Sequence, residues 1–209
     1  QNNLEYDRDI LLKIINLFVD NGLEIDLIPS EGENAYQFNI CEFADSCYQF
    51  DLAAEFFRLG SDIETRKNNV GVITNGHQVI SSADKGLMYL AHQEFCRYIN
   101  LGNKYAPPPR LHPNTAKALK CFSCKFELTD NNEIKMEVTY TESQEYLKSR
   151  NDAIEKVFPE AKKDDMYVTS ESYYVTNKVN YSKVKQGMEL TFSDLFYPII
   201  NEVKKELTA

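Results

Sequence analysis

The stretch that decides the fold is CFSCKFELTDNNEIKMEVTY, residues 121–140, which alternates apolar and polar side chains on both sides of a polar turn. The apolar rows are Phe122, Cys124, Phe126 and Leu128 before the turn, and Ile134, Met136, Val138 and Tyr140 after it. A period of two places each row on one face of a strand. The stretch therefore predicts an antiparallel hairpin with one packed face and one wet face.

The start of the chain predicts a helix followed by two strands and a second helix. Residues 7–21 carry an apolar stripe at the helical period, and Gly22 supplies a stop because glycine accepts the left-handed conformation that ends helices. Strands are expected at 23–28 and 36–43, on either side of a turn, and a helix is expected at 46–59.

A second hairpin is predicted at residues 70–80 from the pair Asn75-Gly76 between apolar segments. Asn-Gly fits the two positive-φ positions of a tight two-residue turn. A third helix, opened by Ser81 or Ser82, is expected to follow.

The segments after the central hairpin extend the same layout. Thr141 and Gln144 have capping-box spacing and predict a helix that ends near Phe158-Pro159. Further strands are expected at 166–176, 179–185 and 188–192, and a last helix from Pro198.

This order predicts an α+β fold, with antiparallel sheet or sheets and helices packed on one side. It is built from an N-terminal helix followed by successive strand-strand-helix units. A doubly wound nucleotide-binding fold does not fit, because it needs single strands that alternate with helices.

A proline-rich stretch near the midpoint divides the chain. Residues 105–113, YAPPPRLHP, contain three successive prolines, which can neither continue a helix nor join the interior of a sheet. We expect an acidic N-terminal α+β lobe over 1–104, a connector over 105–113 and a C-terminal α+β lobe over 114–209. One continuous domain is the alternative.

The acidic side chains are concentrated at the start of the chain. Residues 1–64 hold fourteen Asp and Glu against three Lys and Arg, a net charge of −11, whereas the rest comes to +2. A surface of one sign steers association with partners of the other sign. We therefore expect the carboxylates of residues 23–64 to face another protein with a basic surface. These are Glu24, Asp26, Glu31, Glu33, Glu42, Asp45, Asp51, Glu55, Asp62 and Glu64.

Several classes of partner are not expected. Nucleic acid is a poor candidate, because the longest basic clusters are pairs such as Lys162-Lys163. No run of eighteen apolar residues exists, so no membrane insertion is expected. Five cysteines, an odd number, suit reduced thiols and a soluble cytoplasmic protein. The chain begins at Gln1 without a methionine, which leaves room for a removed signal segment and for a secreted or lipid-tethered surface domain as an alternative.

Two pairs of cysteine and histidine residues have a spacing that occurs in metal or redox sites. Cys121 and Cys124 lie three apart on a predicted strand, which places their thiols on opposite faces. His92 and Cys96 share a helix face, but His92 adjoins the apolar stripe and fits a structural histidine. We therefore expect no metal and no cofactor, and we assign no catalytic residue.

Two classes of function follow. The favoured one is non-enzymatic protein binding, as an inhibitor or immunity protein for a basic toxin or nuclease, or as a chaperone-like adaptor. The rival is a metal-dependent hydrolase or nuclease. It would use Glu133 and Lys135, with Asp130 nearby, because Glu-x-Lys can pair a metal ligand with a charge-stabilising lysine.

Overall fold

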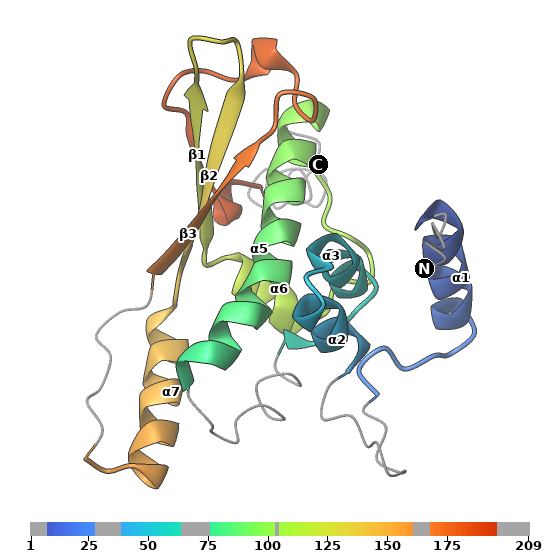
Figure 1. Ribbon diagram of the computed structural model, residues 1–209, viewed down its shortest axis with the longest axis vertical. Coiled ribbons are helices and arrows are strands. Elements are labelled where there is room, and N and C mark those ends of the chain that lie inside the picture. The colour runs from blue at the N-terminus through green and yellow to red at the C-terminus, as the bar shows by residue number, and fades with distance from the viewer. Residues whose placement is uncertain (1–7, 28–38, 64–75, 103–104, 161–167, 196–209) are drawn as a thin grey trace, which may run out of the picture. The chain divides into compact units, whose positions relative to one another are not determined.

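The computed structural model describes residues 8–27, 39–63, 76–102, 105–160 and 168–195. The chain has an α+β fold, with helices and a four-stranded antiparallel sheet (Figure 1). It divides into two units, of which unit 1 comprises 1–86 with 108–115, and unit 2 comprises 87–107 with 116–209. The helix α5, Gly76–Leu101, contributes residues to both units.

The sheet of unit 2 has the strand order β3-β2-β1-β4. Its strands are β1, Phe122–Leu128; β2, Ile134–Thr141; β3, Val168–Tyr174; and β4, Glu189–Thr191. The pairing of β1 with β2 runs from Phe122 opposite Tyr140 to Leu128 opposite Ile134. The predicted antiparallel hairpin is thus confirmed.

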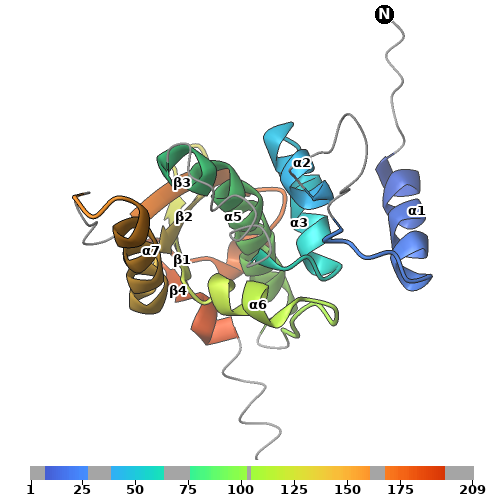
Figure 2. The same cartoon turned by 90° about the horizontal axis from the view of Figure 1, so that it is seen from below.

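One face of this sheet forms the core of unit 2. Figure 2 shows α5 along one face of the strands. Buried on that side are Phe122, Cys124, Phe126, Ile134, Met136, Val138 and Tyr140. Phe95 of α5 meets Phe192 edge-on, with ring centroids 5.5 Å apart. Residues 192–195 form a helical turn directly after β4. The remaining helices are α6, Pro113–Leu119, and α7, Gln144–Val157.

Unit 1 is helical in its described part. Its helices are α1, Arg8–Asp20; α2, Ile40–Ser46; α3, Phe50–Arg58; and the first turns of α5. Phe56, Phe57 and Ala53 of α3 are fully or almost fully buried. A Cβ at Gly86 would lie 2.8 Å from the Cβ of Ala53, so glycine permits α5 to approach α3 this closely.

The predicted end of the first helix is confirmed at Gly22. Its φ is +91°, and the amide of Leu23 donates to the carbonyl of Phe18 at 3.0 Å while that of Gly22 donates to Val19 at 3.1 Å. These two bonds form a Schellman motif, which needs a left-handed residue at the position of Gly22.

The predicted strands of the first half are wrong where they are described. Residues 23–27 form a turn, in which the amide of Leu27 donates to Glu24. Residues 40–43 belong to α2, because Asn39 and Glu42 form a reciprocal capping box that starts a helix. Other parts of these predictions, at 28–38 and 64–75, lie outside the described residues.

Two further predictions are corrected in the same way. Residues 76–80 are the first turns of α5 and not the second arm of a hairpin. The cooperative formation of this long helix outweighs the strand preference of the β-branched Val79 and Ile80. Within the predicted strand 179–185, Tyr181–Lys183 is a 3₁₀ turn, because the Asn180 side chain accepts from the amide of Ser182. β2 runs through Thr141, so α7 begins at Gln144 and not at the predicted capping box. The predicted last helix from Pro198 lies outside the described residues.

Candidate functional site

The predicted partner-binding carboxylates do not share one environment. Glu24 is exposed, whereas Glu42 and Asp45 are buried at 5% and 2% exposure. The half-buried members are Asp26, Asp51, Glu55 and Asp62. Glu31, Glu33 and Glu64 lie outside the described residues. Several of the carboxylates therefore bind groups of unit 1 itself.

Asp26 is the centre of a hydrogen-bond network in unit 1. One of its carboxylate oxygens accepts from the hydroxyl of Ser61 at 2.7 Å and from the side-chain amide of Asn39 at 3.2 Å. The other accepts from the backbone amide of Asp62 at 2.8 Å. Three donors from two segments, Asn39 and the pair Ser61-Asp62, make Asp26 an anchor for the chain after α1. Its chemistry is that of a structural acceptor.

The network continues through Thr115. The Thr115 hydroxyl donates to the carbonyl of Ser61 at 2.7 Å and accepts from the amide of Ile63 at 3.2 Å. The carboxylate of Asp62 lies 3.3 Å from the Nδ1 atom of His112. Polar contacts thus hold the short segment 108–115 against the rest of unit 1.

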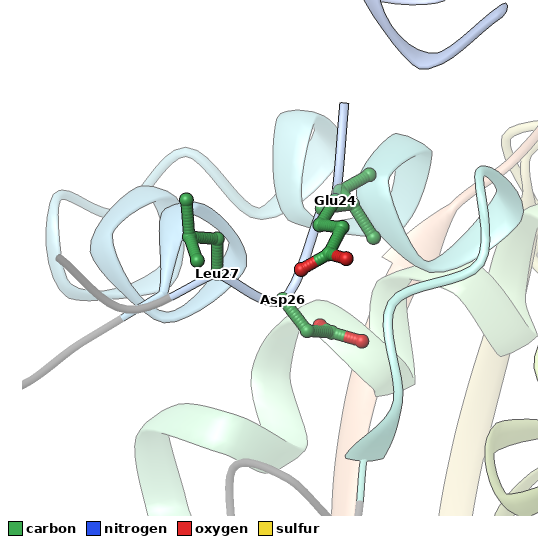
Figure 3. A pocket seen from close by; sticks show the side chains of 4 residues that line it. Glu24, Asp26 and Leu27 are labelled. Atoms are coloured by element: carbon green, nitrogen blue, oxygen red, sulfur yellow. The ribbon is translucent and has the colours of Figure 1, made fainter. Parts of the chain in front are cut away.

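A pocket of about 470 Å³ lies beside the segment that carries Asp26, and Glu24, Ile25, Asp26 and Leu27 line it (Figure 3). Ile25 is buried, whereas Glu24 and Leu27 are exposed. The pocket thus combines an available carboxylate with apolar surface.

The apolar stripe of α1 is open to solvent. Its exposed members are Ile10, Ile14, Leu17 and Phe18, which we call the α1 face; Leu17 is 62% and Phe18 58% exposed. They follow the spacing i, i+4, i+7, i+8 of one helix side. Leu23 and Leu27 extend exposed apolar surface beyond the helix. Exposed apolar side chains that gather in this way are typical of interaction sites.

A polar cluster of unit 2 surrounds His92. His92 is fully buried on α5 and stacks on Tyr173 of β3, with ring centroids 4.3 Å apart and the planes 3° from parallel. Tyr89 meets the His92 ring edge-on at 5.3 Å. The Nζ atom of Lys178 lies 3.1 Å from Nε2 of His92, and Sγ of Cys96 lies 3.7 Å from Nδ1.

The contact with Lys178 fixes the protonation of His92. An ammonium group can only donate, so Nε2 accepts and the neutral ring carries its proton on Nδ1. Burial, and then the charge of Lys178, lower the pKa of His92 to about 3. The imidazole is therefore neutral at physiological pH.

The thiol of Cys96 and the phenol of Tyr173, which lie beside this ring, keep their protons at neutral pH. Burial raises the pKa of the Cys96 thiol to about 12. Burial and then the carboxylate of Glu171 raise the pKa of Tyr173, whose hydroxyl donates to Glu171 at 3.1 Å. A thiol and a phenol held in these states are not nucleophiles at neutral pH. The cluster instead ties the segment that carries Lys178 to α5.

The remaining predicted motifs are placed as follows. Cys124 lies in the buried row of β1, and Cys121 is half-buried just before that strand. Glu133 is exposed beside the turn, and Lys135 lies 3.9 Å from Glu127 across the hairpin. In the part of the chain that the structure describes, no three His, Cys, Asp or Glu side chains are grouped to hold a metal ion. The hydrolase or nuclease alternative stays a prediction.

Among the described helices, none combines the length and the apolar character needed to cross a membrane.

Comparisons with protein-family models, with curated proteins and with solved structures gave no match.

Sequence reasoning missed the partners of both polar clusters. His92 was assigned a structural role next to Cys96, but Tyr173 and Lys178 come from segments about eighty residues further along the chain, and spacing carries no signal for such pairs. For Asp26, the missed signal was local. Asn39 and Glu42 stand at the spacing of a capping box, which would have indicated a helix start there.

Proposed function

We propose that the chain is a non-enzymatic protein-binding domain whose partner has a basic surface. The α1 face carries this proposal, since it exposes four large apolar side chains in the unit that contains the acidic start of the chain. An inhibitor or immunity protein and a chaperone-like adaptor are its two concrete forms.

The apolar side chains would supply the affinity. Full burial of a Leu, Ile or Phe side chain contributes about 1.5–3 kcal/mol, so a few anchors suffice for stable association. Leu17 and Phe18 are the most exposed members of the α1 face and are its expected anchors.

The carboxylates would act on the rate of association. Glu24 is exposed between Leu23 and Leu27, which are exposed as well, so a basic partner on this surface would meet a charge next to apolar contacts. Charges at the rim of an interface mainly change how fast partners meet. Buried Glu42 and Asp45 are not included in this narrower surface.

The test is affinity capture from the source cells with matched variants. We expect wild type and a Phe158→Ser control to capture the same basic protein, because Phe158 is exposed to a similar degree but lies in unit 2. The double variant Leu17→Ser, Phe18→Ser should lose that protein while its circular dichroism stays unchanged. Equal capture by the double variant, or a partner without excess positive charge, would contradict the proposal.

Kinetics with the purified partner then separate the roles of charge and apolar contact. Glu24→Lys should slow association at low salt and leave dissociation nearly unchanged. If the partner is an enzyme or toxin, loss of its activity on binding identifies the inhibitor form, and retained activity the adaptor form.

A further inference from the structure

Within the part of the chain that the structure describes, the strand β3 is an edge of the sheet without the usual protection. It pairs only with β2 among the described strands, as the strand order and Figure 2 show. Its seven residues, VTSESYY, include no proline, lysine or arginine, and its register with β2 is unbroken from Val168 to Tyr174. Proteins commonly protect edges with such residues, with bulges or with short strands. The opposite edge, β4, is only three residues long.

The backbone pattern shows which groups of β3 point outward. The amide of Val175 donates to the carbonyl of Ile134 at 2.8 Å, which makes these opposite residues a hydrogen-bonded pair. Bonded and non-bonded pairs alternate in an antiparallel ladder. Ser170, Ser172 and Tyr174 therefore direct their amides and carbonyls away from β2, and within the described residues these backbone groups have no backbone partner. We call these groups the β3 edge.

The side chains beside this edge have an unbalanced charge. Ser172 pairs with Glu137, and both are exposed on the open face of the sheet. Lys125, opposite Glu137 on β1, lies 3.4 Å from Glu189 instead, and Lys135 pairs with Glu127. Among the residues that the structure describes, Glu137 forms no ion pair.

The small side chain of Ser172 leaves space above Glu137. A strand added to β3 would lie about 10 Å from β2, two strand spacings away. The long side chain of a lysine or arginine opposite Ser172 can extend over the serine toward the Glu137 carboxylate. A basic side chain at this position would therefore form an ion pair with the Glu137 carboxylate on the open face of the sheet.

We propose that the β3 edge binds an extended segment of a basic partner protein as a fifth strand, with a lysine or arginine opposite Ser172 and directed at Glu137. Backbone hydrogen bonds give the affinity of such strand addition, and side chains give its specificity. A second copy of β3 is a poorer complement, because its sequence VTSESYY contains no cation. The surface belongs to unit 2 and does not depend on the α1 face.

The probe is a synthetic peptide, acetyl-TVTKTVT-amide, titrated to millimolar concentration into the ¹⁵N-labelled full chain. We expect chemical-shift changes confined to β3 and its neighbours, and slower hydrogen exchange at the amides of Ser170, Ser172 and Tyr174. The same peptide with glutamate in place of lysine should bind about two- to fivefold more weakly, the range of an exposed ion pair. N-methylation of its lysine and valines should abolish binding, because it removes the donors that face β3.

Two variants of the protein locate the site. Ser172→Pro removes an outward amide that makes no bond to β2, a position where an edge strand accepts proline, and should weaken binding about tenfold or more, while Ser172→Ala should bind as wild type. Glu137→Gln should remove the preference for lysine over glutamate and retain the remaining affinity. The N-methylated peptide gives the same information without a change in the protein.

Three results would overturn the proposal: no shift of the β3 amides at millimolar peptide, equal binding of the lysine and glutamate peptides, or undiminished binding of the N-methylated peptide. A fourth is protection of Ser170 and Ser172 in the peptide-free protein that grows with its concentration, since this would assign the edge to a second copy.

Discussion

Two polar clusters among the described residues, one around Asp26 and one around His92, join distant segments by opposite electrostatic means. In unit 1 the carboxylate of Asp26 accepts three hydrogen bonds from Ser61, Asn39 and Asp62. In unit 2 the ring of His92 is neutral, stacked on Tyr173 and hydrogen-bonded by Lys178. The Asp26 cluster is held by hydrogen bonds that a carboxylate accepts. The His92 cluster is held by the packing of aromatic rings around one hydrogen-bond acceptor, Nε2 of His92.

The difference follows from burial. Asp26 is half-buried, and its oxygens can gather donors without complete loss of water. His92 is fully buried, so that its charged form is disfavoured and its contribution comes from contact with the surrounding rings. We therefore expect the loss of ring volume to matter most at His92, and the loss of oxygens to matter most at Asp26.

The largest effect is expected for His92→Ala. Removal of a buried ring leaves a cavity beside Tyr173 and should lower the free energy of unfolding by about 3 kcal/mol. His92→Phe keeps an aromatic ring but removes the acceptor of Lys178, an exposed side chain that water can solvate, and the weak contact of Nδ1 with Sγ of Cys96, so its cost should be about 1 kcal/mol. The chain contains no tryptophan, so hydrogen exchange at the amides of β2 is the suitable measurement. Equal costs for the two variants would mean that the hydrogen bond, and not packing, dominates at His92.

Acid should affect the same cluster almost as strongly. His92 has a folded pKa of about 3 against an ordinary value of 6.5, so the unfolded chain binds a proton at pH values where the folded chain does not. The contribution of His92 is complete above pH 6.5 and is lost as the pH falls toward 3. At about 1.4 kcal/mol per pH unit, wild type should lose about 3 kcal/mol between pH 6.5 and pH 4 through this group.

The control for the acid effect is His92→Phe, which cannot titrate at this position. Carboxylates titrate in the same range in both proteins, so the difference between their stability curves isolates His92. Parallel curves from pH 7 to pH 4 would show that the folded protein leaves the pKa of His92 at its ordinary value of 6.5, and the account of a buried ring that resists protonation would then fail.

The sequence was sufficient for unit 2 where the signal is local. Alternation in 121–140 predicts both strands and their apolar rows, because strand period and turn are encoded in adjacent residues. The open polar row with Glu137 follows from the same alternation. That β3 pairs with β2 and ends the sheet does not, since the pairing joins segments about thirty residues apart.

In unit 1 the same kind of reasoning failed at 40–43, the described helical part of the predicted strand 36–43. Apolar and aromatic residues favour a strand in isolation, but the capping box of Asn39 and Glu42 starts a helix, and tertiary contacts decide between the two. The acidic surface was overstated for a related reason. A sequence counts carboxylates but does not show that Asp26 and Glu42 bind groups of their own unit.

Among the three main predictions, Asp26→Ala is expected to have the smallest effect, and it tests the cluster in unit 1. The substitution leaves the hydroxyl of Ser61, the amide of Asn39 and the backbone amide of Asp62 without their acceptor, and should lower the free energy of unfolding of unit 1 by about 2 kcal/mol. Slower hydrogen exchange in wild type than in the variant, at the amides of α3, is the direct measurement.

Glu24→Ala, two residues away and exposed, should change this exchange by less than about 0.5 kcal/mol. Asp26→Asn retains one oxygen, which can still accept from Ser61, and should fall between them. If Asp26→Asn leaves the free energy of unfolding unchanged, the three donors around Asp26 do not require its negative charge. The Asp26 and His92 clusters would then differ in burial and not in electrostatics. If Glu24→Ala costs as much as Asp26→Ala, the carboxylates of this segment act together as a charged surface, and the anchoring role assigned to Asp26 alone is wrong.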